Sequence, residues 1–250
     1  MKDKIKNYTK DSESELLGRE LLSELLSNNP IPDDQRLSNL GLFIDSKNLS
    51  RILLMNHLYK QIVDIHGSIF EFGTRWGNNG ALFSSLRSIY EPFNRHRKII
   101  LFDTFEGLKN IHNLDGKNEM MFEKSLSTSK GYEKFLESIM KTHESLNPLS
   151  HIKKFEIVKG DASKEINNYL NENNEIIISL AYFDFDIYKP TKDVLKAIMP
   201  RLCKGSILAF DELNDADAPG ETIALMEEIG LNNIKLERFR YASRVSFFKF

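Results

Sequence analysis

The sequence predicts an α/β fold, in which a mostly parallel, seven-stranded sheet is covered by helices on both faces. Two observations carry this prediction. From about residue 67 onward, short apolar segments of strand length alternate with segments of helix length, the order that is typical of parallel sheets. The last two apolar segments, 234–240 and 244–250, are separated by only a short turn, so they predict a C-terminal antiparallel hairpin.

The first 66 residues lack this alternation and predict a helical cover or lid, built onto the domain that residues 67–250 form. Residues 12–27 are expected to be helical because their leucines repeat on one helical face. The loop 28–34 contains two prolines and ends this helix. A second helix is expected from about residue 50 to residue 65.

The remaining elements follow from the same pattern. The predicted strands before the hairpin are 68–72, 98–103, 155–159, 175–184 and 206–211. The predicted helices between them are 78–90, 132–143, 163–171, 190–202 and 219–230. Pro190 and Pro219 favour helix starts, because proline is well tolerated in the first turn of a helix. The stretch 107–148 is more polar and less regular than the rest.

Composition is ordinary for a soluble globular protein: 250 residues, 41% apolar and 28% charged. The net charge of −2 disfavours a nucleic-acid binder, which usually carries a basic surplus. Cys203 is the only cysteine, which excludes an internal disulfide and a cysteine-rich metal site. No apolar run is long enough to cross a membrane and the N-terminus has no apolar signal segment, so we expect a cytoplasmic protein without a membrane partner. The sequence leaves open whether it forms a homo-oligomer.

A glycine-rich turn joins the first predicted strand to its helix. Gly73, Gly77 and Gly80 have the spacing Gly-x-x-x-Gly-x-x-Gly, whereas dinucleotide sites usually have G-x-G-x-x-G. Glu71 and Thr74 flank the first glycine. An acid and a hydroxyl suit S-adenosylmethionine (SAM), because SAM has no phosphate and carries positive sulfonium and ammonium groups. The alternative is a tight strand–helix turn without a ligand.

Acids at the ends of the next two strands extend this predicted cofactor site. Asp103, which Thr104 follows, is expected to accept hydrogen bonds from the ribose hydroxyls. Asp161, which Ala162 follows, is expected to meet the adenine amino group. Asp161 has an alternative role as the N-cap of the helix that starts near residue 163, and the two roles can coexist.

Two later strands each end in a pair of acids. Asp184 and Asp186 close one strand, and Asp211 and Glu212 close the next. Parallel strands bring their carboxyl ends to one edge of a sheet, so these side chains are expected to converge. Carboxylates held close together repel one another, and an all-oxygen cluster suits a hard cation such as Mg²⁺. The alternative is that each pair caps the helix that follows it.

Residues 67–215 resemble the macrocin O-methyltransferase family, metal-dependent SAM enzymes that methylate hydroxyls of antibiotic sugars. Three segments carry the resemblance. The first is 70–80; the second is 103–108, D-T-F-E-G-L, close to the family's D-S-F-E-G-L. The third is 184–188, D-F-D-I-Y, with 210–212, like its D-G-D-L-Y and I-D-D. The resemblance implies a Rossmann-like class I SAM methyltransferase fold, SAM as methyl donor and a divalent ion, usually Mg²⁺.

The resemblance also implies that Asp186, Asp211 and Glu212 are the metal ligands. Glu212 departs from the family's second aspartate and is longer by a methylene, which makes metal binding by this residue less secure. Phe185 replaces a glycine and brings a large ring to the site, where it narrows the pocket or forms its floor.

Two residues are candidate bases for the acceptor's proton. Lys189 follows Asp186 by three residues, as does the lysine base of catechol-type O-methyltransferases, which this layout also resembles. Its alternative is a solvated residue at a helix start. Asp184 is the competing base and is also placed in the cofactor site, and its alternative is to orient Asp186.

The function that we predict is metal-dependent transfer of a methyl group from SAM to a hydroxyl of a small molecule, a sugar or glycoside. A phenol acceptor of the catechol or caffeoyl type is the first alternative, favoured by Lys189 and Phe185. A non-catalytic SAM-binding scaffold is the second, favoured if Glu212 fails to hold metal.

Overall fold

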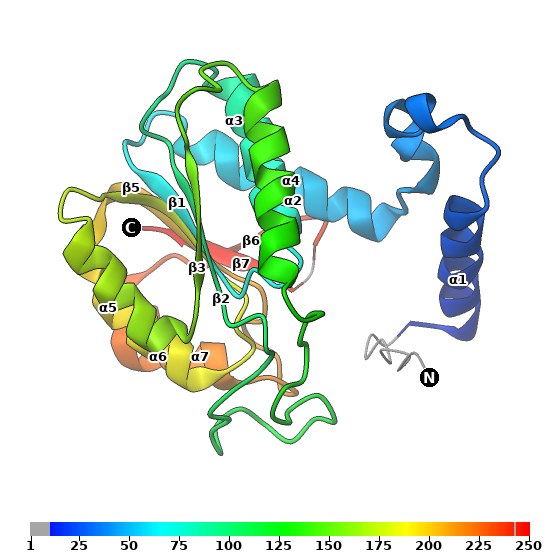
Figure 1. Ribbon diagram of the computed structural model, residues 1–250. Coiled ribbons are helices and arrows are strands. Elements are labelled where there is room, and N and C mark those ends of the chain that lie inside the picture. Colours follow the sequence, from blue (N-terminus) through cyan, green and yellow to red (C-terminus); the bar gives the residue numbers. More distant parts are fainter. Residues whose placement is uncertain (1–10, 243) are drawn as a thin grey trace. The chain divides into compact units, whose positions relative to one another are not determined.

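The computed structural model describes residues 11–242 and 244–250, and it confirms the predicted α/β architecture (Figure 1). The strands form one seven-stranded sheet in the order β3-β2-β1-β4-β5-β7-β6. Neighbours among β1 to β5 are parallel, and β7 is antiparallel to both β5 and β6. The strands are β1 Ser68–Phe72, β2 Ile99–Asp103, β3 Phe155–Lys159, β4 Ile178–Phe183, β5 Leu202–Phe210, β6 Glu237–Arg238 and β7 Ser246–Lys249.

Helices cover both faces of this sheet. The α-helices are α1 Glu13–Ser27, α2 Ser46–Ile62, α3 Asn78–Tyr90, α4 Tyr132–Leu146, α5 Ala162–Glu172, α6 Tyr188–Ile198 and α7 Gly220–Glu228. Short 3-10 helices are Asp33–Gln35, Leu37–Phe43, Met199–Arg201 and Leu231–Asn233. Helices α2 to α4 lie on one face and α5 to α7 on the other (Figure 1). Alternate residues of β4 enter the two cores, Leu180 and Tyr182 on the first face and Ala181 and Phe183 on the second, which explains its continuous apolar run.

Helix α6 ends earlier than the sequence pattern predicts. The prediction extended it to residue 202, but it ends at Ile198 and a 3-10 turn follows. Pro200 explains the difference, because proline lacks the N–H that an α-helix needs. Strand β5 therefore begins at Leu202, where it pairs with Ile178.

The chain divides into two units, Met1–Arg51 and Ile52–Phe250. The described part of the smaller unit contains α1. Ser12 is the N-cap of this helix and forms a capping box with Glu15. No residue of α1 is buried, and its leucine stripe is exposed. In the larger unit, the part of α2 from Leu54 onward packs into the core, so this part of the predicted cover is integral to that unit. Among the described residues, no helix is long and apolar enough to cross a membrane.

A buried arginine fastens the amino edge of the sheet. Arg97, which is 1% exposed, donates to the carbonyls of Ile62 and Ile65 at 2.7 and 2.8 Å. It also donates to the carbonyl of Gly67, just before β1, and pairs with Glu91 at 2.9 Å. Because these carbonyls would otherwise be left without donors near the end of α2, one side chain holds helix and sheet together. The opposite, carboxyl edge carries the candidate site.

The order of the strands places that site at a switch point. Strand β1 lies between β2 and β4, so the chain runs outward from β1 in both directions. Ligands of open α/β sheets bind at this point, beyond the carboxyl ends of the strands. The backbone joins the two sides there: the N–H of Asp184 donates to the carbonyl of Phe72 at 2.9 Å, and the N–H of Gly73 donates to the carbonyl of Phe102 at 2.9 Å.

Candidate functional site

The glycine turn after β1 is wedged between neighbouring segments. Gly73 and Gly77 have φ of +86° and +78°, in the left-handed region that favours glycine. A Cβ on Gly73 would lie 1.9 Å from the carbonyl oxygen of Asp184, and one on Gly77 would lie 2.2 Å from a methyl of Leu136. The backbone turn therefore favours glycine at both positions, and packing against the backbone of Asp184 also requires it at Gly73, whereas at Gly77 the side chain of Leu136 would have to shift.

Two polar side chains of this turn are buried. Glu71 is 1% exposed at the carboxyl end of β1, with Oε2 3.4 Å from a Cβ built on Gly80. Thr74 is 5% exposed, and its hydroxyl has no hydrogen-bond partner among the described residues. A buried polar atom without a partner is costly, so the Thr74 hydroxyl has the chemistry of a ligand contact.

The acid at the end of β2 holds the two neighbouring loops. Asp103 accepts the N–H of Arg75 at 2.7 Å and the N–H of Phe105 at 2.5 Å. Burial raises the pKa of the Asp103 carboxyl above its usual value, and these hydrogen bonds oppose the shift. A carboxylate has four lone-pair sites, so Asp103 can still accept from a ligand. The hydroxyl of Thr104 instead stabilises the loop that follows β2, because it donates to the carbonyl of Gly107 at 2.9 Å.

At the end of β3, the capping role that the sequence offers for Asp161 is confirmed. Its carboxylate accepts the N–H of Ser163 at 3.0 Å and caps α5. Ala162 begins that helix and is 4% exposed. Contact of these two residues with adenine stays a prediction.

A cavity of about 350 Å³ opens beside the loop that follows Asp103. It is bordered by Phe105, by Lys159 at the end of β3 and by Gly131, the N-cap residue of α4. Two further lysines, Lys124 and Lys130, line it. Glu106 and Glu133 line it as well, and Glu133 pairs with Lys159. The cavity lies on the β2–β3 side of the switch point, whereas the acid pairs lie on the β4–β5 side.

The structure brings together one acid from each predicted pair. Burial, with the nearby negative charge of Asp211, raises the pKa of the Asp186 carboxyl to about 7. Asp186 has a left-handed φ of +61°, which is uncommon for a residue with a side chain. The hydroxyl of Tyr182 donates to Asp211 at 2.6 Å and fixes that carboxylate. Asp186 and Asp211 thus lie near enough at the carboxyl edge of the sheet to interact electrostatically, and we call them the acidic pair.

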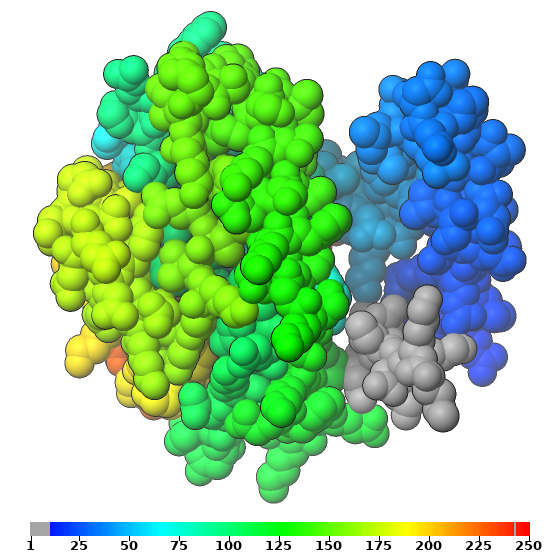
Figure 2. Space-filling model, in the orientation of Figure 1, coloured from blue at the N-terminus to red at the C-terminus, as the bar shows by residue number. Residues whose placement is uncertain are grey.

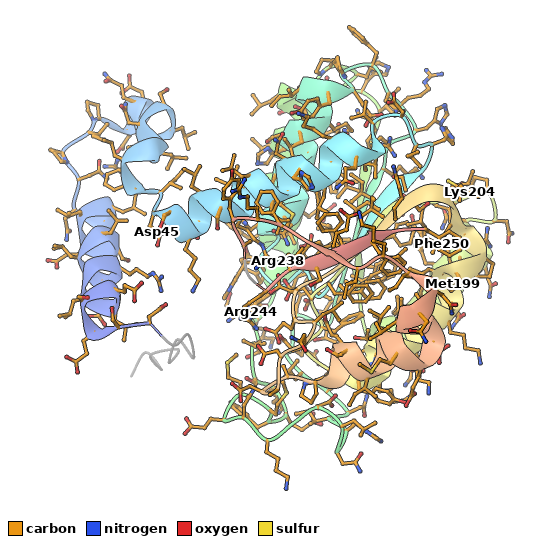
Figure 3. All side chains as sticks on the ribbon, turned by 180° about the vertical axis from the view of Figure 1, so that it is seen from behind. Asp45, Met199, Lys204, Arg238, Arg244 and Phe250 are labelled. Carbon is orange, nitrogen blue, oxygen red and sulfur yellow. The ribbon has the colours of Figure 1, made fainter. Side chains whose placement is uncertain are left out.

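Glu212 forms a salt bridge with a positively charged side chain of the same protein. Its carboxylate pairs with Arg244, which lies in the connection between β6 and β7 (Figure 3). The same guanidinium is 3.9 Å from a carboxylate oxygen of Asp215. Within residues 11–242 and 244–250, no three His, Cys, Asp or Glu side chains are grouped so that they could hold a metal ion together.

The two candidate bases have different surroundings. Lys189 lies in the first turn of α6 with a 56% exposed side chain, and its ammonium pairs with Asp193 at 2.7 Å on the helix surface. Asp184 is half-buried and lies over the glycine turn, where its carbonyl leaves no room for a Cβ on Gly73. The ring of Phe185 packs against Phe72 at a centroid distance of 5.7 Å.

Sequence reasoning did not identify Glu221 as part of the site. It lies in the first turn of α7, is 0% exposed, and accepts the N–H groups of Phe185 and Asp186 at 2.9 and 3.3 Å. Burial, and next the charge of Asp186, raise the pKa of Glu221 well above its usual value. The sequence shows only an acid after Pro219, which is the ordinary composition of a helix N-terminus.

Comparison with known proteins identifies close structural relatives. No protein-family model and no curated protein matches the chain. The crystal structure of CalS11, a calicheamicin methyltransferase, matches with a TM-score of 0.94 and 37% identity over 96% of this chain and 94% of that one. An apo structure of CalS11, described as a TDP-rhamnose 3′-O-methyltransferase of calicheamicin biosynthesis, matches with a TM-score of 0.86 and 36% identity over 96% of each chain. The O-methyltransferase NovP has the same fold, with a TM-score of 0.62 and 14% identity over 94% of this chain and 98% of NovP.

The packing of the glycine turn predicts a difference between two glycine substitutions. Gly73 and Gly131 both have positive φ, but a Cβ on Gly131 would meet nothing within 4 Å. Both Gly→Ala changes incur the left-handed strain of roughly 1–2 kcal/mol. Only Gly73→Ala also collides with the backbone of Asp184, so we expect it to melt at a lower temperature than Gly131→Ala and to lose binding of S-adenosylhomocysteine (SAH). Thermal unfolding and calorimetry measure both effects, and equal losses in the two variants would contradict the packing argument.

Proposed function

Because the chain belongs to the macrocin-type sugar O-methyltransferases of class I, the family that includes CalS11, we propose that it methylates a hydroxyl of a sugar carried on a nucleoside diphosphate. Membership of this family makes the protein a SAM-dependent O-methyltransferase. The sugar acceptor and the requirement for a divalent ion go further and are our proposal. The observation that carries the acceptor class is the 36% identity, over 96% of both chains, with a TDP-rhamnose 3′-O-methyltransferase.

We place SAM at the switch point, across the carboxyl ends of β1 to β3. Gly73 and Gly77 support this placement because their backbone turns tightly at the strand end. The partnerless hydroxyl of Thr74 supports contact with the amino-acid part of SAM, next to Glu71. The spare lone pairs of Asp103 support contact with the ribose. We place the adenine of SAM next to Thr104, Asp161 and Ala162. We place Asp184 at the other end of the proposed site, near the methyl group.

The acidic pair fits a divalent cation in its chemistry. Asp186 and Asp211 offer only oxygen atoms, and the pKa of Asp186 is raised first by burial and next by the charge of Asp211, while Arg244 and Arg75 oppose the shift only in part. We propose that these two residues hold the ion. Glu212 is the third proposed ligand. To bind the ion, its carboxylate has to leave the salt bridge with Arg244. When bound, a divalent ion supplies Lewis-acid polarisation of the acceptor hydroxyl.

The chain's own residues carry out the remaining work. Asp184 lies at the seam between the glycine turn and the acid pair, and we propose that its carboxylate takes the proton of the acceptor hydroxyl. SAM, when bound, would supply the methyl group for the acceptor oxygen, because its carbon–sulfur bond breaks readily and leaves neutral SAH. Phe185, packed on Phe72, forms an apolar floor that helps to exclude water. Lys189 acts as base only if it leaves Asp193.

The phenol alternative receives less support. It depended on Lys189 as a base, and this ammonium is exposed and paired with Asp193. A putative caffeoyl-CoA O-methyltransferase structure matches at 10% identity, which indicates a shared fold alone.

We expect the purified protein to methylate TDP-rhamnose, with SAM as donor, and to leave catechol unmodified. EDTA should abolish the transfer and added Mg²⁺ should restore it. Asp211→Asn should lower the rate at least about tenfold because it removes a charged ligand, whereas Glu119→Gln, which changes an exposed acid outside the pair, should keep the rate. Mass spectrometry of the products checks each arm. Methylation of catechol alone would overturn the acceptor class, and transfer that EDTA does not affect would overturn the metal.

The Asp103 carboxyl predicts a pH dependence of SAH binding. Its ionised form accepts ribose hydroxyls, and burial raises its pKa above the usual 3.8. Affinity should therefore fall as the pH is lowered through this raised pKa, because the protonated carboxyl accepts fewer hydrogen bonds. Asp103→Asn should bind SAH more weakly and lose this pH dependence. Calorimetry between pH 5 and 8 measures it, and an unchanged slope in Asp103→Asn would assign the titration to another group.

A further inference from the structure

A buried carboxylate fastens the segment 104–131, between β2 and α4, to the turn that carries Asp186. Asp115 is 0% exposed and accepts the N–H of Tyr188 at 2.5 Å and the N–H of His112 at 2.6 Å. Tyr188 is the first residue of α6, and its N-cap residue, Ile187, supplies no side-chain cap. Asp115 therefore caps α6 from a distant part of the chain. The N–H that it accepts, that of Tyr188, comes two residues after Asp186.

The same junction includes the start of α7. A Cβ on Gly220 would lie 2.5 Å from the N atom of Tyr188 and 2.6 Å from Oδ1 of Asp115. The neighbouring contacts are equally close: Asn118 donates to the carbonyl of Asp217 at 2.8 Å, and a Cβ on Gly116 would lie 2.7 Å from that oxygen. The segment 104–131, α6 and α7 thus meet with no room for an added methyl group. Figure 2 shows the green residues of this segment and α4 forming much of one face of the larger unit.

A second carboxylate holds the turn from the other side. Glu221 accepts the N–H groups of Phe185 and Asp186, while Asp115 accepts that of Tyr188. Asp186 itself has a left-handed φ, a conformation that persists only where the surroundings enforce it. The two carboxylates therefore fix the backbone that aims Asp186.

The segment also reaches the other half of the site. It begins directly after Asp103, which accepts the N–H of Phe105. It then closes on itself, because Leu108 and Ser125 are joined by an N–H to carbonyl hydrogen bond of 2.8 Å. One folded segment therefore connects the acid proposed for the SAM ribose with the turn proposed for the metal.

We propose that Asp115 is a positioning residue for methyl transfer, which holds the segment 104–131 and the Asp186 turn together as one unit. It touches no reacting atom and acts through Tyr188 and the backbone of Asp186. This inference rests on the proposed function for its link to catalysis, but the coupling itself is a property of the fold.

Hydrogen exchange of the SAH-bound protein tests the coupling without any need for activity. We expect Asp115→Ala to speed amide exchange at least about tenfold both in the segment 104–131 and at 185–188, with the strand interiors unchanged. Glu119→Gln, an exposed acid of the same segment, is the matched control and should leave both regions protected. Faster exchange in 104–131 alone, or in neither region, would overturn the proposal.

Kinetics test the link to catalysis. Asp115→Ala should lower kcat about tenfold or more and raise KM for SAM by a smaller factor, because the turn of Asp186 loses its cap directly whereas Asp103 lies outside the loosened segment. If Asp115→Ala does not fold, Gly220→Ala tests the same junction, since its methyl would press on Asp115 and Tyr188 without changing charge. A raised KM for SAM with unchanged kcat would overturn the positioning role. If the wild type methylates no acceptor, the proposed function fails, and hydrogen exchange still decides the coupling.

Discussion

Burial of neighbouring carboxyl groups at the carboxyl edge of the sheet, which removes them from water and brings like charges close enough to repel one another, is the constraint on which the rest of the site depends. Asp186, Asp211 and Glu221 come from three different elements, and burial together with their mutual charge raises the pKa of Asp186 and Glu221. The fold moderates this repulsion with neutral donors: backbone N–H groups for Glu221 and the Tyr182 hydroxyl for Asp211. These donors fix the acids without supplying a countercharge, and the positive charges that act on Asp186 come from Arg244 and Arg75.

The opposite edge of the sheet is treated differently. There Arg97 forms a salt bridge with Glu91 and donates its other N–H groups to backbone carbonyls. The positive charge of the arginine is therefore balanced within the chain. A second buried pair, Arg87 with Glu144 at 2.9 Å, joins α3 to α4 in the same way. Paired charges therefore hold the scaffold at the amino edge, whereas buried acids with a raised pKa, among them Asp103, Asp186 and Glu221, lie at the carboxyl edge. This division is what a scaffold with a reactive edge requires.

Much of the fold could be predicted from the sequence because it depends on local pattern. The alternation of apolar and amphipathic segments located every strand of the sheet, and the glycine turn and the acid pairs located the edge where the site lies. Element ends were less predictable, as Pro200 shows for α6. The sequence analysis did not identify Asp115 and Glu221. Both accept backbone N–H groups of residues far away in the chain, and no spacing in the sequence indicates such a contact. The same holds for Arg244, which pairs with Glu212 from across the hairpin.

The claim at the centre of this account is that the chain leaves negative charge at Asp186 and Asp211 for a divalent ion to balance. Calorimetric titration of Mg²⁺ into the SAH-bound protein tests it most directly. The account predicts that each chain binds one ion, that Asp186→Asn and Asp211→Asn each abolish binding, and that Asp193→Asn on the surface of α6 does not. Absence of binding to the wild-type protein, or unchanged affinity in Asp186→Asn, would contradict it.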